Sequence, residues 1–231
     1  MYKFTLIIPI FNEEKNILKL YNEISQCKAI ELISNIIYVD DASNDKSQLL
    51  LKDIANKDSK VIILTNSINL GQSESIFLGI KKADTDYVIT LDGDGQNDPN
   101  DIINLINFFN SDRSYGLIAG IRRNRKDNFI KKITSKIANN IRKIYLNDDC
   151  DDTGCALKLF EKKLIVNFTF FNGIHRFLPA IYKGMGRKCY FINVNHRHRK
   201  YGISKYGTFN RLFVGIRDML KVKKLIKNHK Q

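Results

Sequence analysis

Short apolar segments alternate with longer helix-like segments through the first half of this chain, and this rhythm is its strongest constraint on the fold. The apolar segments are KFTLIIPI (3–10), ISNIIYVD (33–40), KVIILT (60–65), YVITLD (87–92) and YGLIAG (115–120). The segments between them, which have the apolar spacing of helices, are 14–26, 45–57, 72–83 and 98–110. Strand–helix–strand units at this spacing predict an α/β fold, with a mostly parallel sheet covered by helices on both faces.

The second half of the chain departs from this rhythm. Residues 121–147 place isoleucines at helical spacing with Lys and Arg between them, which predicts a basic amphipathic helix. A further strand is expected at 188–197, and a second basic amphipathic helix at 207–228. No repeat or linker divides the 231 residues. We therefore expect one domain over residues 1–207, with 208–231 as a C-terminal helix that belongs to it or docks on a membrane.

The chain is strongly basic, because 38 Lys and Arg residues outnumber 24 Asp and Glu residues and give a formal net charge of +14. Such a charge indicates an anionic partner, either nucleic acid, a phosphorylated ligand or an anionic membrane surface. The 4 cysteines show no Cys-x-x-Cys spacing, and the N-terminal apolar run resembles a strand more than a leader. These features predict reduced cysteines and a cytoplasmic protein. The sequence contains no run of ~18 uncharged apolar residues, so no membrane span is expected.

Four polar loops follow the predicted strands of the first half. They read PIFNEE, VDDASND, NSINLGQ and DGDGQND. In a parallel sheet the carboxyl ends of the strands lie at one edge, where ligands of α/β proteins gather. The sequence therefore predicts a ligand site at this edge of the sheet.

The last of these loops, LDGDGQNDP (91–99), concentrates acidic residues in a basic chain. Asp92 and Asp94 stand two residues apart beside glycines that permit a tight turn. Carboxylates this close repel one another unless a cation, a helix N-terminus or water separates their charges. Together with Gln96 they offer the oxygen ligands that Mg²⁺ or Mn²⁺ prefers. Asp98 before Pro99 predicts instead the N-cap of the next helix.

The acidic loop has two other interpretations. One is a polar turn that binds nothing, which an isolated Asp-x-Asp pair permits. The other is a calcium loop of the EF-hand type. That loop is excluded because Asn97 stands where a glycine is needed and Ile103 stands where a bidentate Glu is needed.

Further segments follow one another in an order that resembles a known family. They are IPIFNEEKNI (8–17), VDDASNDKS (39–47), NLGQSESIFLGI (69–80), LDGDGQNDP (91–99), GIRRNRKD (120–127), DTGCALKLFEK (152–162), GIHRFLPAI (173–181) and VNHRHRKYGISKYG (194–207). Together they resemble the family-2 glycosyltransferases of the GT-A (Rossmann-like) fold. More narrowly, the chain is similar to the polyprenyl-phosphate (dolichol-phosphate) hexose synthases. The resemblance covers nearly the whole chain.

The resemblance implies an inverting, metal-dependent transferase that moves a hexose from a UDP- or GDP-sugar to a polyprenyl phosphate, in cell-envelope glycan or lipid modification. The residues that it implies for the nucleotide-sugar are Pro9, Phe11, Glu13, Val39, Asp41, Asp92, Asp94, Arg199 and Lys205. Glu13 would accept hydrogen bonds from the ribose, and Val39 and Asp41 would meet the base. Asp92, Asp94 and Gln96 would hold Mg²⁺ or Mn²⁺. On local grounds alone, Glu13 and Asp41 could equally be helix-capping or turn residues.

For the acceptor, the resemblance implies that Arg122, Lys131 and Ser135 hold the lipid phosphate, and that Arg199 and Lys205 close over the diphosphate. Lys132 is an equal neighbour of Lys131. The expected catalytic set is Asp92, Asp94, Arg122, Lys131 and Ser135. A phosphate monoester, whose second pKa is ~6, is mostly dianionic at neutral pH and needs no general base. The histidines at 175, 196 and 198 are given no role.

A lipid acceptor predicts peripheral attachment to the cytoplasmic face of a membrane. The apolar face expected to dock there is Phe209, Leu212, Phe213, Ile216, Met219 and Leu220, with Lys and Arg meeting anionic headgroups. The alternative is that this face packs on the domain. A homo-oligomer or a membrane-protein partner is a further possibility. Two rival functions are a family-2 transferase with a saccharide acceptor and a basic nucleic-acid-binding protein. No nucleic-acid-reading motif is present, so we expect no nucleic-acid partner.

Overall fold

The computed structural model describes residues 2–122, 139–199 and 208–230, and the side chains within these ranges other than those of 208–214. The elements of the first half are β1 (Phe4–Ile10), α1 (Glu14–Gln26), η1 (Ile30–Leu32), β2 (Ile33–Asp40), α2 (Ser47–Ala55), β3 (Val61–Thr65), α3 (Gln72–Lys82) and β4 (Tyr87–Thr90). They are followed by η2 (Pro99–Asp101), α4 (Ile102–Ser111), β5 (Tyr115–Arg122), β6 (Lys158–Glu161), α6 (Lys162–Val166), η3 (Ile174–Arg176), α7 (Leu178–Gly184), β7 (Lys188–Val194) and α8 (Thr208–Lys230).

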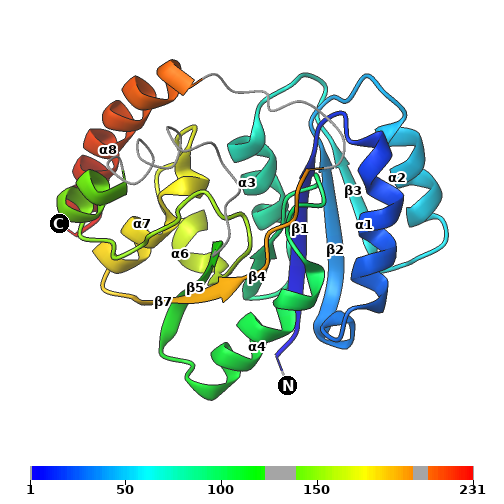
Figure 1. Cartoon of the computed structure of the whole chain (residues 1–231), viewed down its shortest axis with the longest axis horizontal. Coiled ribbons are helices and arrows are strands. Elements are labelled where there is room, and N and C mark those ends of the chain that lie inside the picture. Colours follow the sequence, from blue (N-terminus) through cyan, green and yellow to red (C-terminus); the bar gives the residue numbers. More distant parts are fainter. Residues whose placement is uncertain (1, 123–138, 200–207, 231) are drawn as a thin grey trace.

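The strands form one sheet in the order β3-β2-β1-β4-β6-β5-β7. β1 pairs in parallel with β2 and β4, β2 with β3, and β5 with β7. β6 alone among the described strands runs antiparallel, between β4 and β5. Figure 1 shows helices on both sides of this sheet. The predicted α/β fold, with a mostly parallel sheet flanked by helices, is confirmed.

Each face of the sheet carries its own hydrophobic core. Side chains alternate across a strand, so Leu6 and Ile8 of β1 point to one core and Ile7 points to the other. The first core is closed by α1, α2 and α4, and the second by α3, α6, α7 and α8. Burial on both faces explains why the strands of the first half are nearly continuous apolar runs.

The boundaries predicted for the first half agree with the structure to within a few residues, but four described elements of the second half were missed, namely β6, α6, η3 and α7. β6 has only four residues, and because it begins with Lys158 and ends with Glu161 it does not form an apolar run. α6 has five residues, and α7 has seven with Pro179 in its first turn. Elements this short carry too little periodicity to be recognised from the sequence.

Two expected boundaries need correction. β5 runs to Arg122, so residues 121 and 122 belong to a strand and not to the basic helix predicted at 121–147. Within the described part of that segment, residues 139–146 are helical, with Ile144 85% exposed. Ile130, Ile133 and Ile137 lie outside the described residues. β7 ends at Val194, three residues before the predicted end at 197.

The C-terminal helix α8 packs one of its faces on the domain. Val222 is completely buried in the second core, and a Cβ atom added at Gly184 of α7 would come within 2.7 Å of Ile226. Ile216 and Leu220 lie on the other face and are 46% and 56% exposed. Over the described residues, no helix combines the length and the apolarity needed to cross a bilayer.

Candidate active site

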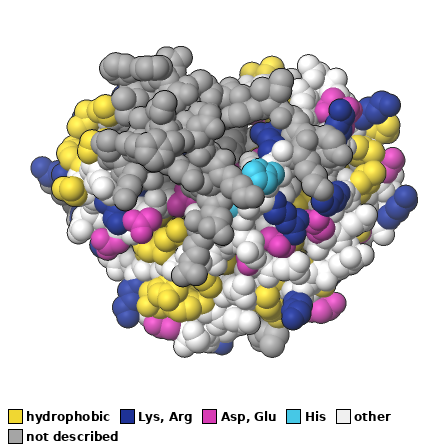
Figure 2. Space-filling model, in the orientation of Figure 1, with side chains coloured by type: hydrophobic (Ala, Val, Ile, Leu, Met, Phe, Trp, Pro, Cys, Tyr) yellow, Lys and Arg dark blue, Asp and Glu magenta, His cyan; other side chains and the backbone are white. Residues whose placement is uncertain are grey.

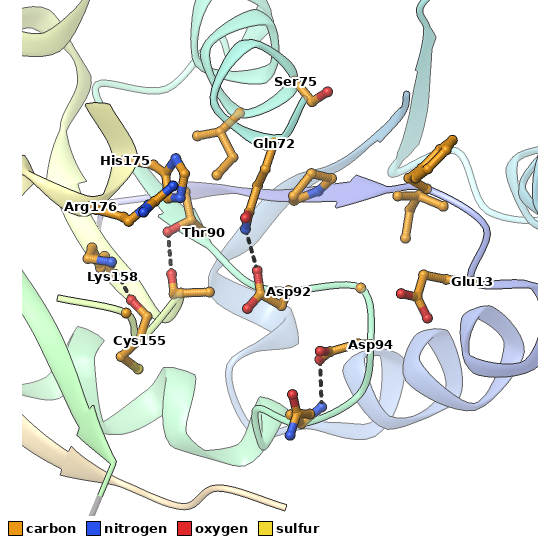
Figure 3. A pocket seen from close by; sticks show the side chains of 18 of the residues that line it. Glu13, Gln72, Ser75, Thr90, Asp92, Asp94, Cys155, Lys158, His175 and Arg176 are labelled. Atoms are coloured by element: carbon orange, nitrogen blue, oxygen red, sulfur yellow. Dashed lines mark hydrogen bonds between the residues drawn. The ribbon is translucent and has the colours of Figure 1, made fainter. Parts of the chain in front are cut away.

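A cavity of about 710 Å³ opens where β1, β2 and β4 end, at the edge of the sheet that the sequence predicted. Its size is that of a site for a small molecule. It is lined by residues that include Pro9, Phe11, Glu13, Asp41, Gln72, Asp92, Asp94, Gln96, Arg122, Lys158, His175, Arg176, Arg197 and Arg199. Figure 2 shows basic and acidic side chains side by side near the middle of this face, around a histidine. Figure 3 shows the cavity from close by.

The acidic turn after β4 lies on the cavity wall, with Asp92 and Asp94 both facing the space (Figure 3). A Cβ atom at Gly93 would come within 2.9 Å of the Pro9 carbonyl oxygen, and Gly95 has a φ of +72°. A Cβ atom would clash at position 93, and a residue other than glycine would be strained at the positive φ of position 95. The two glycines flanking Asp94 therefore let the turn pack tightly against the end of β1.

The two carboxylates are held by different donors. The Gln72 side-chain amide donates to Asp92 Oδ1 over 2.7 Å, and the Gln96 backbone N–H donates to Asp94 Oδ1 over 3.0 Å. Burial, and then the negative charge of Asp94, raise the pKa of Asp92 to about 7. A divalent cation between the two carboxylates would relieve this repulsion. The oxygen-rich pair therefore fits Mg²⁺ or Mn²⁺.

Gln96, the third expected metal ligand, also faces the cavity, and its side-chain amide donates to the Arg197 carbonyl oxygen over 3.2 Å. Among the described residues there is no group of three or more His, Cys, Asp or Glu side chains that could hold a metal ion. Asp98 has the role that the sequence indicated. It caps η2, with Asn100 N–H donating to its carboxylate over 3.0 Å and Pro99 in the first turn.

Of the residues expected to bind the nucleotide, those that the structure describes are brought together, with one exception. Pro9, Phe11, Glu13 and Asp41 all line the cavity. Val39 does not, because its side chain is fully buried in the second core. Val39 lies within β2, where alternation along the strand directs its side chain into the helix layer, whereas Asp41 follows the end of the strand.

Asp41 is a buried carboxylate that organises the loop before α3. It accepts hydrogen bonds from the backbone N–H groups of Leu70 and Gly71, both over 2.8 Å, and from the Asn66 side chain over 2.8 Å. These donors stabilise its charge within the protein. The turn-forming role that local sequence left open for Asp41 is therefore present in the structure, beside its place on the cavity wall.

Glu13 stands at the N-cap position of α1, yet its side chain makes no capping hydrogen bond. One carboxylate oxygen accepts from Asn16 over 2.7 Å, and the other accepts from Arg199 over 2.6 Å. Arg199 also lies 3.8 Å from Asp94. A single guanidinium thus connects Glu13 with the acidic turn.

The segment that carries Arg199 is fastened across the acidic turn. Arg197 N–H donates to the Gln96 carbonyl oxygen over 2.8 Å, and its guanidinium pairs with Glu23 at 2.6 Å and Asp98 at 2.9 Å. A β-bridge joins His196 to Asn97. These contacts hold residues 196–199 over one side of the cavity.

Arg122 and Lys158 add two basic side chains to the lining of the cavity. Arg122 forms a two-pronged pair with Asp152, with nitrogen–oxygen distances of 2.6 and 2.7 Å, and a Cβ atom at Gly154 would come within 2.8 Å of Arg122 Nη2. Lys158 is only 2% exposed and donates to the Thr153 and Cys155 carbonyl oxygens. Burial lowers the pKa of Lys158.

Several cavity residues were not anticipated from the sequence, namely Gln72, Lys158, His175 and Arg176. Gln72, His175 and Arg176 lie within segments that carried the family resemblance, and that position was the available signal. Lys158 also lies within such a segment, DTGCALKLFEK (152–162), although the strand β6 that begins with it was missed. Lys131, Lys132, Ser135 and Lys205 lie outside the described residues.

The arrangement, a parallel-sheet edge with two carboxylates between an acidic and a cationic wall, suits a ligand that carries a diphosphate. The family model of Glycosyl transferase family 2 matches residues 5–168. The chain belongs to this family. Its GT-A relatives therefore provide the frame in which the cavity can be interpreted.

Among its curated relatives in the family is the undecaprenyl-phosphate 4-deoxy-4-formamido-L-arabinose transferase of Proteus mirabilis strain HI4320, which is 34% identical over 94% of this chain and 67% of the relative. The protein of the same name from Pectobacterium atrosepticum is 32% identical over 94% of this chain and 66% of the relative. The chain thus spans about two thirds of the length of the curated relatives that it matches.

Solved structures agree on the fold. Glucosyl-3-phosphoglycerate synthase from Mycobacterium tuberculosis, crystallised with Mn²⁺, UDP and glucosyl-3-phosphoglycerate, matches with a TM-score of 0.71 at 14% identity, over 96% of this chain and 78% of that one. The same synthase with Mg²⁺ and UDP matches with a TM-score of 0.72 at 14% identity, over 94% of this chain and 79% of that one. At this level of identity, the likeness shows a shared GT-A fold.

Proposed function

We propose that this family-2 chain transfers a sugar from a UDP- or GDP-sugar to a polyprenyl phosphate, with inversion at the anomeric carbon. The observation that carries the proposal is the Asp92–Asp94 pair, which lies between Glu13 and Lys158 in Figure 3, in a cavity that Arg122 also lines. The names of the relatives from Proteus and Pectobacterium support the choice of a lipid phosphate as acceptor.

The donor would lie with its nucleoside toward Pro9, Phe11 and Glu13 and its diphosphate at the acidic turn. Asp92, Asp94 and Gln96 would hold Mg²⁺ or Mn²⁺. When bound, the divalent ion supplies positive charge that stabilises the departing nucleoside diphosphate. Arg199, which already lies 3.8 Å from Asp94, adds a second positive charge on the same side.

The acceptor needs positioning more than activation. A phosphate monoester oxygen would attack the anomeric carbon while the bond from that carbon to the diphosphate oxygen breaks, so the nucleoside diphosphate leaves with the bonding electrons. The dianionic phosphate is already a nucleophile at neutral pH, and no proton has to be removed. Arg122, fixed in orientation by Asp152, would offset the charge of the two approaching phosphates.

A polyprenyl acceptor also requires contact with a membrane surface, and we propose peripheral docking on its cytoplasmic face. Ile141 and Ile144 of the helical segment at 139–146 are exposed, as are Ile216 and Leu220 of α8. The two helices contact each other, since the Lys223 ammonium lies 3.9 Å from the centre of the Tyr145 ring. Apolar side chains among Lys and Arg residues match an anionic interface.

The direct test of the proposed function is transfer of a radiolabelled sugar to a short polyprenyl phosphate by the Asp94→Ala and Arg122→Ala variants. We expect each to lower the rate about 100-fold or more, because each removes a charge next to the departing or attacking phosphate. Undiminished transfer by both variants would refute the assignment. A thermal-shift screen of UDP- and GDP-sugars with Mn²⁺ identifies the donor.

Docking is tested separately, by sedimentation with vesicles of zwitterionic lipid with and without an anionic lipid. Replacing Ile144 and Leu220 together by Ser should reduce the bound fraction. The same double substitution at Leu18 and Leu49, which are also exposed apolar residues but lie on α1 and α2, is the matched control. Equal binding by both double variants would argue against docking through this surface.

A further inference from the structure

Arg176 lies on the cavity wall, on the short helical turn η3, which is fixed to the start of α3. Gly173 N–H donates to Ser73 Oγ over 2.7 Å, and Ser73 Oγ shares a hydrogen bond of 2.7 Å with His175 Nδ1. Gly173 has a φ of +99°, and a Cβ atom there would come within 2.9 Å of an Asp218 carboxylate oxygen. The turn is therefore held by close packing, and the position of Arg176 follows from it.

Four arginines of the described residues line the cavity, and three of them are committed to carboxylates. Arg122 pairs with Asp152, Arg197 with Glu23 and Asp98, and Arg199 with Glu13. The fourth is Arg176. Within the described part of the chain, its guanidinium has no hydrogen-bond acceptor and no ion-pair partner. Asp218 on α8 interacts electrostatically with Arg176 but forms no ion pair with it. Burial raises the pKa of Asp218, and the positive charge of Arg176 opposes that shift.

The surroundings of Arg176 favour a negatively charged ligand. Figure 3 shows Arg176 next to His175 and Thr90, above the buried Lys158. Lys158 donates to two backbone carbonyl groups, and Asp152 and Asp92 act on its charge without an ion pair among the described residues. Burial, and then the charges of Arg176 and Lys158, lower the pKa of His175 well below its usual value, so the imidazole stays neutral. Among the described residues, neither of these two cations beside the neutral imidazole forms an ion pair with a carboxylate, so this wall favours an anion.

Arg176 is also separated from the nucleotide side of the cavity. Glu13 and Asp94 lie at one end of the view in Figure 3, and Arg176 and Lys158 lie at the other, with Asp92 between them. Arg199 contacts Glu13 and lies 3.8 Å from Asp94, so it belongs to the first end. A donor diphosphate at the acidic turn would therefore lie close to Arg199. It would not reach Arg176 and Lys158, which remain open to a second anion. An arginine fork binds the oxygens of a phosphate monoester with strong, directional hydrogen bonds.

We propose that Arg176 binds the phosphate of the acceptor, so that the cationic wall of Arg176, Lys158 and Arg122 is a subsite for a phosphate monoester dianion. This inference rests on the proposed function and assigns a part of it to a residue. Arg176 makes the direct contact, since it has unused donors. Lys158 contributes its charge from beneath, and Arg122 has its Nε and Nη2 donors occupied by Asp152.

The test is steady-state kinetics of Arg176→Met and Arg176→Lys with a short polyprenyl phosphate and the donor identified by the thermal-shift screen. For Arg176→Met we expect the KM of the acceptor to rise about 10- to 100-fold, which is the usual effect of losing charge-assisted hydrogen bonds. The KM of the donor should change less than about twofold, and Arg176→Lys should recover part of the loss. Inorganic phosphate should compete with the acceptor in the wild type and lose this effect in Arg176→Met.

The matched control is Arg187→Met, because Arg187 is 52% exposed in its side chain, pairs with Glu161 at 3.0 Å and does not line this cavity. It should leave both KM values unchanged. An unchanged acceptor KM in Arg176→Met would overturn the inference, as would a raised donor KM with a normal acceptor KM. Binding of UDP or GDP with Mn²⁺, measured on the same samples, distinguishes a failure of the inference about Arg176 from a failure of the proposed function. A wild type that binds neither nucleotide contradicts the proposed function itself.

Discussion

Arg199 and Glu13, 186 positions apart in the sequence, form an ion pair within the cavity, with 2.6 Å between guanidinium nitrogen and carboxylate oxygen. The arginine proposed for the diphosphate thus pairs with the carboxylate proposed for the ribose. We expect Arg199 to turn from Glu13 to the diphosphate when the donor binds. This exchange costs little if the diphosphate replaces the carboxylate as the partner of Arg199.

The first prediction concerns Arg199. Arg199→Gln should raise the KM of the nucleotide-sugar about 10-fold and leave the KM of the acceptor unchanged, because the lost charge acts on the diphosphate. Steady-state kinetics with each substrate varied in turn measures both values. Arg113→Gln is the control, since Arg113 lies over the Tyr2 ring and outside the cavity. A larger effect on the acceptor than on the donor would contradict the assignment.

The second prediction concerns Gln72, whose amide donates to Asp92 Oδ1 over 2.7 Å. Gln72→Ala should weaken Mn²⁺ binding and lower turnover by about 10-fold, because Asp92 loses the donor that orients it. Gln72→Glu removes the same donor but adds a negative charge beside Asp92, so it should bind Mn²⁺ more tightly than Gln72→Ala. Mn²⁺ binding is followed by electron paramagnetic resonance, without a turnover assay. Lys82→Ala, at the exposed end of the same helix, is the control, and equal Mn²⁺ affinity in all three variants would contradict the prediction.

The third prediction concerns the acidic turn. Gly93→Ala should lower the free energy of unfolding by about 1–3 kcal/mol, because the new methyl group would press on the Pro9 carbonyl oxygen and on Ile10. Gly215→Ala is the opposite case: nothing lies within 4 Å of its Cβ position in α8, and alanine favours the helix by about 1 kcal/mol. Chemical denaturation measures the free energy of unfolding, which should fall in Gly93→Ala and rise in Gly215→Ala. A Gly93→Ala protein as stable as the wild type would show that the turn is not tightly packed.

The fourth prediction concerns pH and His175, whose pKa in the folded protein is lowered by burial, followed by the charges of Arg176 and Lys158. In the unfolded chain the pKa is ~6.5. Between these two values the unfolded chain binds a proton that the folded protein does not, so stability is complete above about pH 6.5 and falls as the pH drops below it.

His175→Gln removes this group, and the loss of Tm between about pH 7.5 and about pH 5.5 should therefore be smaller than in the wild type. His198→Gln, a change at an exposed histidine, should leave the pH dependence of Tm as it is in the wild type. If the Tm of His175→Gln fell with pH as steeply as that of the wild type, the neutral state assigned to the buried imidazole would be wrong.

The first five strands could be predicted because both faces of the sheet are buried, which makes β1 to β5 apolar runs of ordinary length. β6 could not, because its four residues begin with Lys158, a lysine that is buried only through contacts with the Thr153 and Cys155 carbonyl groups. The pairing of β6 with β4 and β5 depends on partners distant in sequence, and no local pattern encodes it.

The site shows the same division. Asp92, Asp94 and Glu13 could be placed on the cavity from strand ends and family resemblance, since each closely follows a recognisable strand. Val39 was expected beside Asp41, but its position within β2 turns its side chain into the core. Arg176 was not anticipated, because its place on the cavity wall follows from the docking of η3 on Ser73, a contact between residues 100 positions apart in the sequence.

The central claim, that Asp92 and Asp94 hold a divalent cation against the diphosphate of a nucleotide, is tested most directly by isothermal titration calorimetry. UDP and GDP are titrated into the wild type, Asp92→Asn and Asp94→Asn. Each titration is made once with Mn²⁺ and once with a chelator. The account predicts that one nucleotide binds the wild type only with Mn²⁺, and that both variants lose this metal-dependent binding. Binding of neither nucleotide to the wild type, or equal binding with Mn²⁺ and with chelator, would contradict it.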